Sequence, residues 1–155
     1  MAITFTYSNN TLFNDVSLLS AYMTKNLSEN LGANLDEFAI SEDEHDVYGV
    51  CLKQTLPNIH ECLIKLNYGE TGVVVDGDSI TITIKDNKAY NDNVKTLVED
   101  TLYDCLKYGV LSEFYSININ PTLQKLSQDK FASYLLLLNQ RLFQLKRKMI
   151  SSVLD

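Results

Sequence analysis

The chain has 155 residues, of which 45% are hydrophobic and 21% charged, and its formal net charge at pH 7 is −7. These values are typical of one globular domain and exclude an intrinsically disordered chain. An acidic surface repels phosphate backbones, so free nucleic acid is not an expected general partner. We find neither an apolar run long enough to span a membrane nor a signal peptide. Three widely spaced cysteines indicate a reducing compartment.

The N-terminal residues allow two interpretations. Apolar and polar side chains alternate from Thr4 to Tyr7, which fits either a free arm, residues 1–12, or an edge strand. A first helix is predicted from near Asn14 to about Leu27. Its apolar residues recur every three or four positions and form one stripe, namely Val16, Leu19, Met23 and Leu27.

A second helix is predicted after Ser41. The Ser41 hydroxyl can accept a hydrogen bond from a backbone amide of the first turn while the Glu44 side chain reaches back, which is a capping box. Apolar residues then continue at helical spacing to Leu66, so the helical segment extends over residues 14–66. Pro57 lies inside it and removes one backbone donor, and is therefore predicted to kink this helix or to split it.

A β-hairpin is the clearest local prediction. The residues Asp76, Gly77 and Asp78 separate two β-branched runs, and glycine supplies the positive φ that a tight turn requires. The hairpin covers about residues 73–84, within 72–85. Its isoleucines share one face, and because a lone hairpin is marginal in water, this face must rest on a helix or on a neighbouring subunit.

Two long helices are predicted over residues 91–149. The third helix runs from Asn91 to Tyr115, and the fourth begins at Asn120 and Pro121, a cap followed by proline at the first helical position. The fold class is therefore mainly α, a bundle of about four helices with an inserted β-hairpin, in a single domain of residues 1–155.

No motif for catalysis, cofactor binding or metal binding is found in the sequence. It contains no Cys-x-x-Cys, no His-Glu-x-x-His and no glycine-rich phosphate loop. His60 and Cys62 do not point in one direction on a helix, and His45 lies in an acidic first turn. The expectation is a protein that is not an enzyme and that holds no metal and no cofactor.

Three features allow both a structural interpretation and an interaction interpretation. The acidic stretch 36–46 is either a solvated helix start or a contact surface for a basic patch. The basic end of the last helix either complements the helix dipole or contacts an acidic neighbour. The aromatic cluster around the end of the third helix is either the edge of the core or an interface, and comprises Tyr103, Tyr108, Phe114 and Tyr115.

The order of these elements resembles a known family. The hairpin leads through residues 85–93 into a helix with Leu97-Val98-Glu99-Asp100, residues 38–67 precede it, and Leu142-Phe143-Gln144-Leu145-Lys146 ends the last helix. This resembles small virion proteins of the crAss-like tailed bacteriophages that infect Bacteroidetes, and also the helical head–tail connector proteins of tailed phages. The resemblance implies a homo-oligomeric, dodecameric ring below the portal, in the neck or upper tail, which lines the DNA channel.

The expected partners follow from this resemblance. They are further copies of the chain, the portal, neighbouring neck or tail proteins, and passing genomic DNA without specific binding, with no membrane. The protein would be found in the virion, and in the host cytoplasm during assembly. The residues predicted at subunit contacts belong to the hairpin and the last helix, namely Val73, Val75, Ile80, Ile82, Ile84, Arg141, Lys146, Arg147 and Lys148.

An alternative function is a cytosolic phage early protein that binds and inhibits a host factor, with an acidic surface that mimics DNA. A variant distinguishes assembly from folding in the first hypothesis. Ile82→Asp is expected to spoil assembly while leaving the helix content largely intact.

Overall fold

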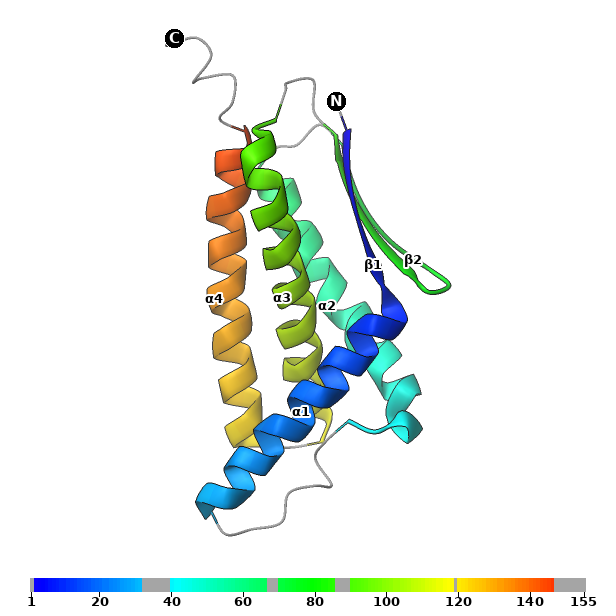
Figure 1. Cartoon of the computed structure of the whole chain (residues 1–155), viewed down its shortest axis with the longest axis vertical. Coiled ribbons are helices and arrows are strands. Elements are labelled where there is room, and N and C mark those ends of the chain that lie inside the picture. The colour runs from blue at the N-terminus through cyan, green and yellow to red at the C-terminus, as the bar shows by residue number, and fades with distance from the viewer. Residues whose placement is uncertain (1, 32–39, 67–69, 86–89, 119, 147–155) are drawn as a thin grey trace.

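The computed structural model describes residues 2–31, 40–66, 70–85, 90–118 and 120–146, and in 26–31 the backbone alone. Its helical bundle and small sheet confirm the predicted fold class (Figure 1). No described helix has the length and hydropathy needed to cross a membrane. The elements in chain order are β1 (Ala2–Ser8), α1 (Asn9–Leu31), the short 3-10 helix η2 (Glu42–Glu44), α2 (His45–Lys65), β2 (Glu70–Asp76), β3 (Ser79–Lys85), α3 (Asp92–Ile117) and α4 (Pro121–Lys146).

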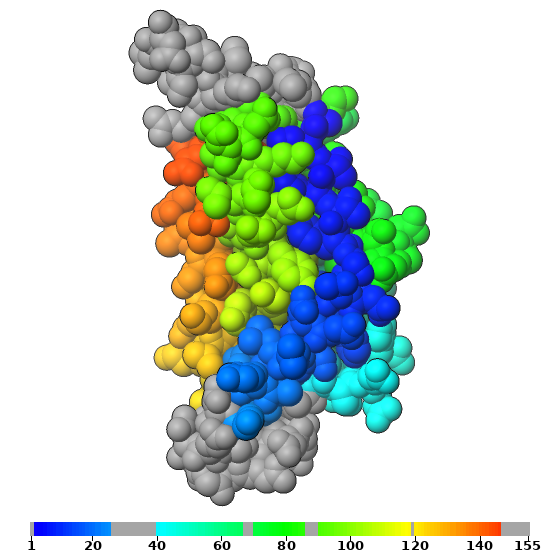
Figure 2. Space-filling model, in the orientation of Figure 1, coloured from blue at the N-terminus to red at the C-terminus, as the bar shows by residue number. Residues whose placement is uncertain are grey.

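Helix α3 lies at the centre of the molecule. α2 and α4 flank α3 and run in the direction opposite to it. α1 crosses diagonally in front of the lower part of α3 (Figure 1). In the space-filling view, β1 and α1 lie directly against α3, and α4 forms the opposite margin (Figure 2). The start of α4 agrees with the cap predicted at Asn120, and Asn91, which was not predicted as a cap, caps α3. The Asn91 side chain accepts a hydrogen bond from the Asn93 amide, and the Asn120 side chain accepts one from the Leu123 amide.

Helix α2 is continuous through Pro57. Of the two predicted effects of Pro57, a kink or a split, the split is therefore wrong. Proline leaves the carbonyl of the residue four positions earlier, Lys53, without its helical donor. Both residues are exposed, so water can bond to this carbonyl and the loss is tolerated.

The N-terminal residues form a strand and not a free arm. β1 pairs antiparallel with β3, with Phe5 opposite Ile82, and the strand order is β1-β3-β2. Of the two interpretations of this segment, the edge strand is correct. The reason is burial, because β1 places one face in the core through Ile3, Phe5 and Tyr7. The first helix also begins earlier than predicted, at Asn9.

The hairpin of β2 and β3 has the predicted turn, in which Gly77 has φ +57°. Its isoleucine face packs on the helices of the same chain (Figure 1). Ile80, Ile82 and Ile84 are all completely buried. This face was expected to rest on a helix or on a neighbouring subunit, and in the structure the helices of the same chain cover it.

Asp78 joins the hairpin turn to the start of α1. Its carboxylate accepts hydrogen bonds from the Asn10 amide at 2.7 Å and the Ser8 hydroxyl at 2.9 Å, and its backbone oxygen accepts one from the Asn9 amide at 2.6 Å. The Ser8 hydroxyl in turn accepts one from the Thr11 amide at 3.2 Å. The first three amides of α1 are therefore satisfied, and two of them are satisfied by the distant turn.

We expect Asp78→Ala to lower the free energy of unfolding by about 1–2 kcal/mol, because it removes a helix N-terminal acceptor. Urea titration followed by circular dichroism measures this loss. Asp76→Ala is the matched control, since Asp76 is an exposed carboxylate of the same hairpin that takes no part in these contacts. Equal losses from the two variants would contradict a capping role for Asp78.

Candidate protein-binding surfaces

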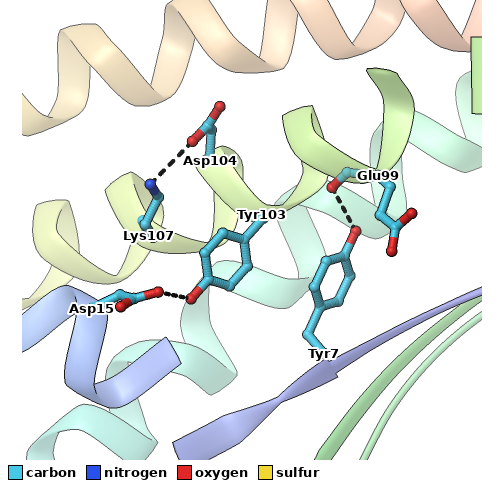
Figure 3. Close-up of polar contacts among 6 residues, drawn as sticks. All are labelled: Tyr7, Asp15, Glu99, Tyr103, Asp104 and Lys107. Atoms are coloured by element: carbon cyan, nitrogen blue, oxygen red, sulfur yellow. Dashed lines mark hydrogen bonds and ion pairs between the residues drawn. The ribbon is translucent and has the colours of Figure 1, made fainter. Parts of the chain in front are cut away.

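A groove of about 460 Å³ lies between β1 and α3. Tyr7 and Tyr103 stack in it, with ring centres 5.7 Å apart and 19° between the ring planes (Figure 3). The other lining residues are polar or acidic, namely Thr6, Ser8, Thr11, Glu99, Asp100 and Asp104. The sequence placed Tyr103 in an aromatic cluster but gave no sign that Tyr7, from the other end of the chain, would stack on it.

The two tyrosine hydroxyls of the groove tie separate elements together. Tyr7 donates to the backbone oxygen of Glu99 at 2.7 Å, and Tyr103 donates to the Asp15 carboxylate of α1 (Figure 3). Burial is the main cause that raises the pKa of both hydroxyls well above the usual value. At neutral pH both therefore stay protonated and act as hydrogen-bond donors, which joins β1 and α1 to α3.

Lys107 shows which kind of group this groove attracts. Its ammonium lies 5.3 Å from the centre of the Tyr103 ring and 3.2 Å from the Asp104 carboxylate. An aromatic face and a carboxylate both favour a cation. The chain itself already supplies that cation at this end of the groove.

The buried phenols and thiols predict a loss of stability at alkaline pH. Burial raises the pKa of Tyr7, Tyr48 and Tyr115 above their usual value of 10.0, and that of the Cys51 thiol from 9.0 to about 11. Above about pH 9–10 the unfolded chain therefore binds fewer protons than the folded protein, and the free energy of unfolding falls as the pH rises.

Tyrosinate absorbance and helical circular dichroism, recorded together in an alkaline titration, test this. We expect much of the tyrosinate signal to appear together with the loss of helix. Full tyrosine ionisation while the helices persist would contradict the burial of these hydroxyls. Denaturant titrations at neutral and alkaline pH give the accompanying decrease in stability.

The predicted contact residues of the hairpin occupy different environments. Ile80, Ile82 and Ile84 are completely buried in the core, so their assignment to a subunit contact is corrected: these side chains are not at the surface. Val73 is partly buried against the core. Val75 is 41% exposed, and of the five it is the residue most accessible to a partner.

The predicted basic contact residues are bound within the chain where they are described. Arg141 donates to the Thr101 hydroxyl at 2.5 Å and to the Leu97 backbone oxygen at 3.3 Å. Lys146 donates to the backbone oxygen of Leu66, the residue after α2, at 2.6 Å. These contacts join α4 to α3 and α2. Arg147 and Lys148 lie outside the described residues.

The aromatic cluster at the end of α3 divides between core and surface. Phe114 and Tyr115 are completely buried, whereas Tyr108 is partly buried and stacks on Tyr134 of α4, with ring centres 5.4 Å apart. Tyr108 therefore lies at the edge of the core, and Tyr115 lies deeper than the core-edge interpretation supposed.

The cysteine thiols of the described residues are packed in the core, and the His60 imidazole contacts a neighbouring strand. All three cysteines are buried and free, and burial keeps the pKa of the Cys105 thiol far above its usual range. His60 lies 2.9 Å from the Thr71 hydroxyl and so joins α2 to β2. Within the described segments, no three His, Cys, Asp or Glu side chains come close enough together to hold a metal ion.

Several exposed apolar side chains were not singled out by the sequence. On α4, Leu136 is 61% exposed. On α2, Val50 and Ile64 are about half exposed. Only the orientation of each helix in the bundle could separate these residues from the core. Comparisons of this chain with protein-family models, with curated proteins and with solved structures find no match.

Proposed function

We propose that this protein is a structural virion protein, a subunit of a homo-oligomeric head-to-tail connector ring in the neck or upper tail of a tailed bacteriophage. It acts through protein–protein contacts and lines the channel through which DNA passes. The resemblance of its element order to connector proteins supports this role, and so does its net charge of −7, because an acidic lining does not hold passing DNA.

The observation that carries the proposal is the edge strand β2. It lies at the end of the strand order, and Val74 and Val75 on it are 57% and 41% exposed. Its sequence, residues 70–76, contains neither lysine nor proline, the residues that commonly protect an exposed edge. Such a strand can take an extended segment of a neighbouring protein.

The charges of β2 favour a different strand as its neighbour over a second β2. If two copies paired antiparallel about Val73, Glu70 of each copy would lie opposite Asp76 of the other. Like charges directly opposite each other destabilise a sheet. The edge is therefore suited to a heterologous contact, which is the type that builds rings.

Quantitative mass spectrometry of purified particles tests this role, with the copies of this protein counted against the portal. A ratio near one to one is expected. Absence from the particle would refute the connector role and favour the cytosolic early protein that inhibits a host factor.

A variant of the edge strand tests which element enters the assembly. We expect Val75→Lys to remain folded but to enter particles several-fold less, because a lysine on an edge strand opposes strand addition. Ile117→Lys is the matched control, since Ile117 on α3 is 47% exposed. Equal incorporation of both variants would show that β2 is not the contact.

A further inference from the structure

We infer that the outer face of α4 in one copy packs against the outer face of α2 in the next copy. This contact rests on the proposed ring and specifies two helix surfaces that meet in it, in addition to the β2 edge. The α2 stripe consists of the exposed residues Asp46, Val50, Lys53, Pro57 and Ile64. The α4 stripe consists of the exposed residues Lys125, Asp129, Leu136, Gln140 and Phe143.

Each stripe lies on one side of its helix, opposite the core. Successive members are three, four or seven positions apart, which places them on a single face. On α2 the buried side includes Thr55 and Ile59, and on α4 it includes Leu138 and Leu142. The stripes therefore face away from the bundle on two different sides of the molecule.

Two contacts show which residues of α2 and α4 lie at the same height along the bundle axis, which we call the same level. A side chain at Gly109 of α3 would meet both Thr55 of α2 and Phe131 of α4. Phe131 comes 76 positions after Thr55 in the sequence. Lys146 bonds to Leu66, 80 positions earlier. A residue of α2 is therefore level, to within about one turn, with the α4 residues 76 to 80 positions after it.

At these levels the two stripes are complementary. Asp46 is level with residues 122–126, which include Lys125, and Lys53 is level with 129–133, which include Asp129. The two pairs of opposite charge occupy the half of each helix that is nearer its N-terminus. The α2 and α4 residues of each pair are both exposed.

The other half of each stripe carries no charge and is mostly apolar. Pro57 is level with residues 133–137, which include Leu136, and Ile64 is level with 140–144, which include Gln140 and Phe143. Residues 131–140 of α4 carry no charge. Both stripes extend over 18 positions (46 to 64 and 125 to 143), about 27 Å along each helix.

The direction of the helices fits a ring. α2 and α4 run the same way along the bundle (Figure 1). Rotation about an axis parallel to these helices keeps both their direction and their level. Copies related by such a rotation bring level residues of α4 and α2 together, and two different faces of one chain meet at every contact, which closes into a ring when the rotation closes.

Cysteine cross-linking of the purified full-length chain tests this contact. In Lys53→Cys/Asp129→Cys, a short bismaleimide should produce a ladder of oligomers in denaturing gels. The native thiols are at most 8% exposed, so they contribute little. The control Lys53→Cys/Gln140→Cys places the second thiol about 10–16 Å from the matched level and should give no ladder.

The outcomes of the cross-linking separate three arrangements. A ladder from the matched pair alone supports the contact. Dimers alone would indicate a two-fold contact and would overturn it, and so would no ladder at the highest attainable concentration. Equal ladders from the matched and control pairs would also overturn it.

Charge reversal provides a second test. Lys53→Glu alone or Asp129→Lys alone should weaken association about two- to fivefold, the range for an exposed charge pair. The double variant restores opposite charges at every contact, and its association should return to within about twofold of the original. A double variant no better than the single variants would overturn the pairing.

The contact and the proposed role can fail separately. If the ladder forms but the protein is missing from particles, the α2–α4 contact stands and the connector role fails. If particles contain the protein at the portal ratio but the matched pair gives no ladder, the role stands and the contact fails.

Discussion

Ile82→Asp is expected to unfold the whole protein rather than to remove a contact between subunits. Ile82 is completely buried at the centre of β3, opposite Phe5 of β1 and Val73 of β2. A carboxylate there would be desolvated in an apolar core. Changes of this kind cost more than about 4 kcal/mol, a large part of the 5–15 kcal/mol by which a typical domain is stable.

Thr81→Asp is the control for this variant. Thr81 is the adjacent residue of β3 and faces the other side of the sheet, partly exposed. We expect this change to cost only about 1 kcal/mol, the span of strand propensities. Circular dichroism and urea titration distinguish the two variants. A cooperative, stable fold with full helix content in Ile82→Asp would show that the isoleucine face is not in the core.

This expectation replaces the one drawn from the sequence, that Ile82→Asp would spoil assembly and leave the helix content largely intact. The alternation of isoleucine and threonine identified an apolar face correctly, but it could not identify what covers that face. The helices that cover it and the strand β1 that pairs with β3 come from other parts of the chain. β1 is about 80 residues from β3, and a strand pairing of that separation leaves no local signal.

The helices were predictable because their signals are local. Spacing of apolar residues marked all four, and the cap at Asn120 marked the start of α4. The start of α1 was placed too late because two of its first three amides bond to Asp78 in the hairpin turn. A helix end capped from elsewhere in the chain cannot be located from neighbouring residues.

The surfaces were less predictable than the fold. The basic residues at the end of α4 matched an interface pattern, yet Arg141 and Lys146 bond to groups of the same chain. The stacked pair of Tyr7 and Tyr103 joins residues 96 positions apart (7 and 103). The rotation of each helix about its own axis decides which of its apolar residues, such as Leu136, are exposed.

Gly109→Ala is expected to destabilise the protein, although alanine is the better helix former. In the structure, a Cβ at Gly109 would collide with the Thr55 methyl group and would lie 3.1 Å from the Phe131 ring. The Thr55 hydroxyl donates to the Cys51 backbone oxygen at 2.9 Å in the core, so this side chain cannot turn away without losing that bond.

The sign of the effect follows from two opposing terms. Alanine gains about 1 kcal/mol of helix propensity over glycine, and overpacking at a close helix contact costs about 3 kcal/mol. The expected net loss is about 2 kcal/mol. Gly49→Ala is the matched control in α2, where no atom lies within 4 Å of the added Cβ, and it should raise the free energy of unfolding by up to about 1 kcal/mol.

A second-site change separates the collision from any other effect at Gly109. Thr55→Ser removes the methyl group and keeps the hydroxyl, so the Gly109→Ala/Thr55→Ser double variant should recover most of the stability lost by Gly109→Ala. Urea titrations of the variants give the coupling between the two sites. If Gly109→Ala proved as stabilising as Gly49→Ala, α2 and α4 could not approach α3 as closely as they do here. The common level of the α2 and α4 stripes would then lose one of its two supporting contacts.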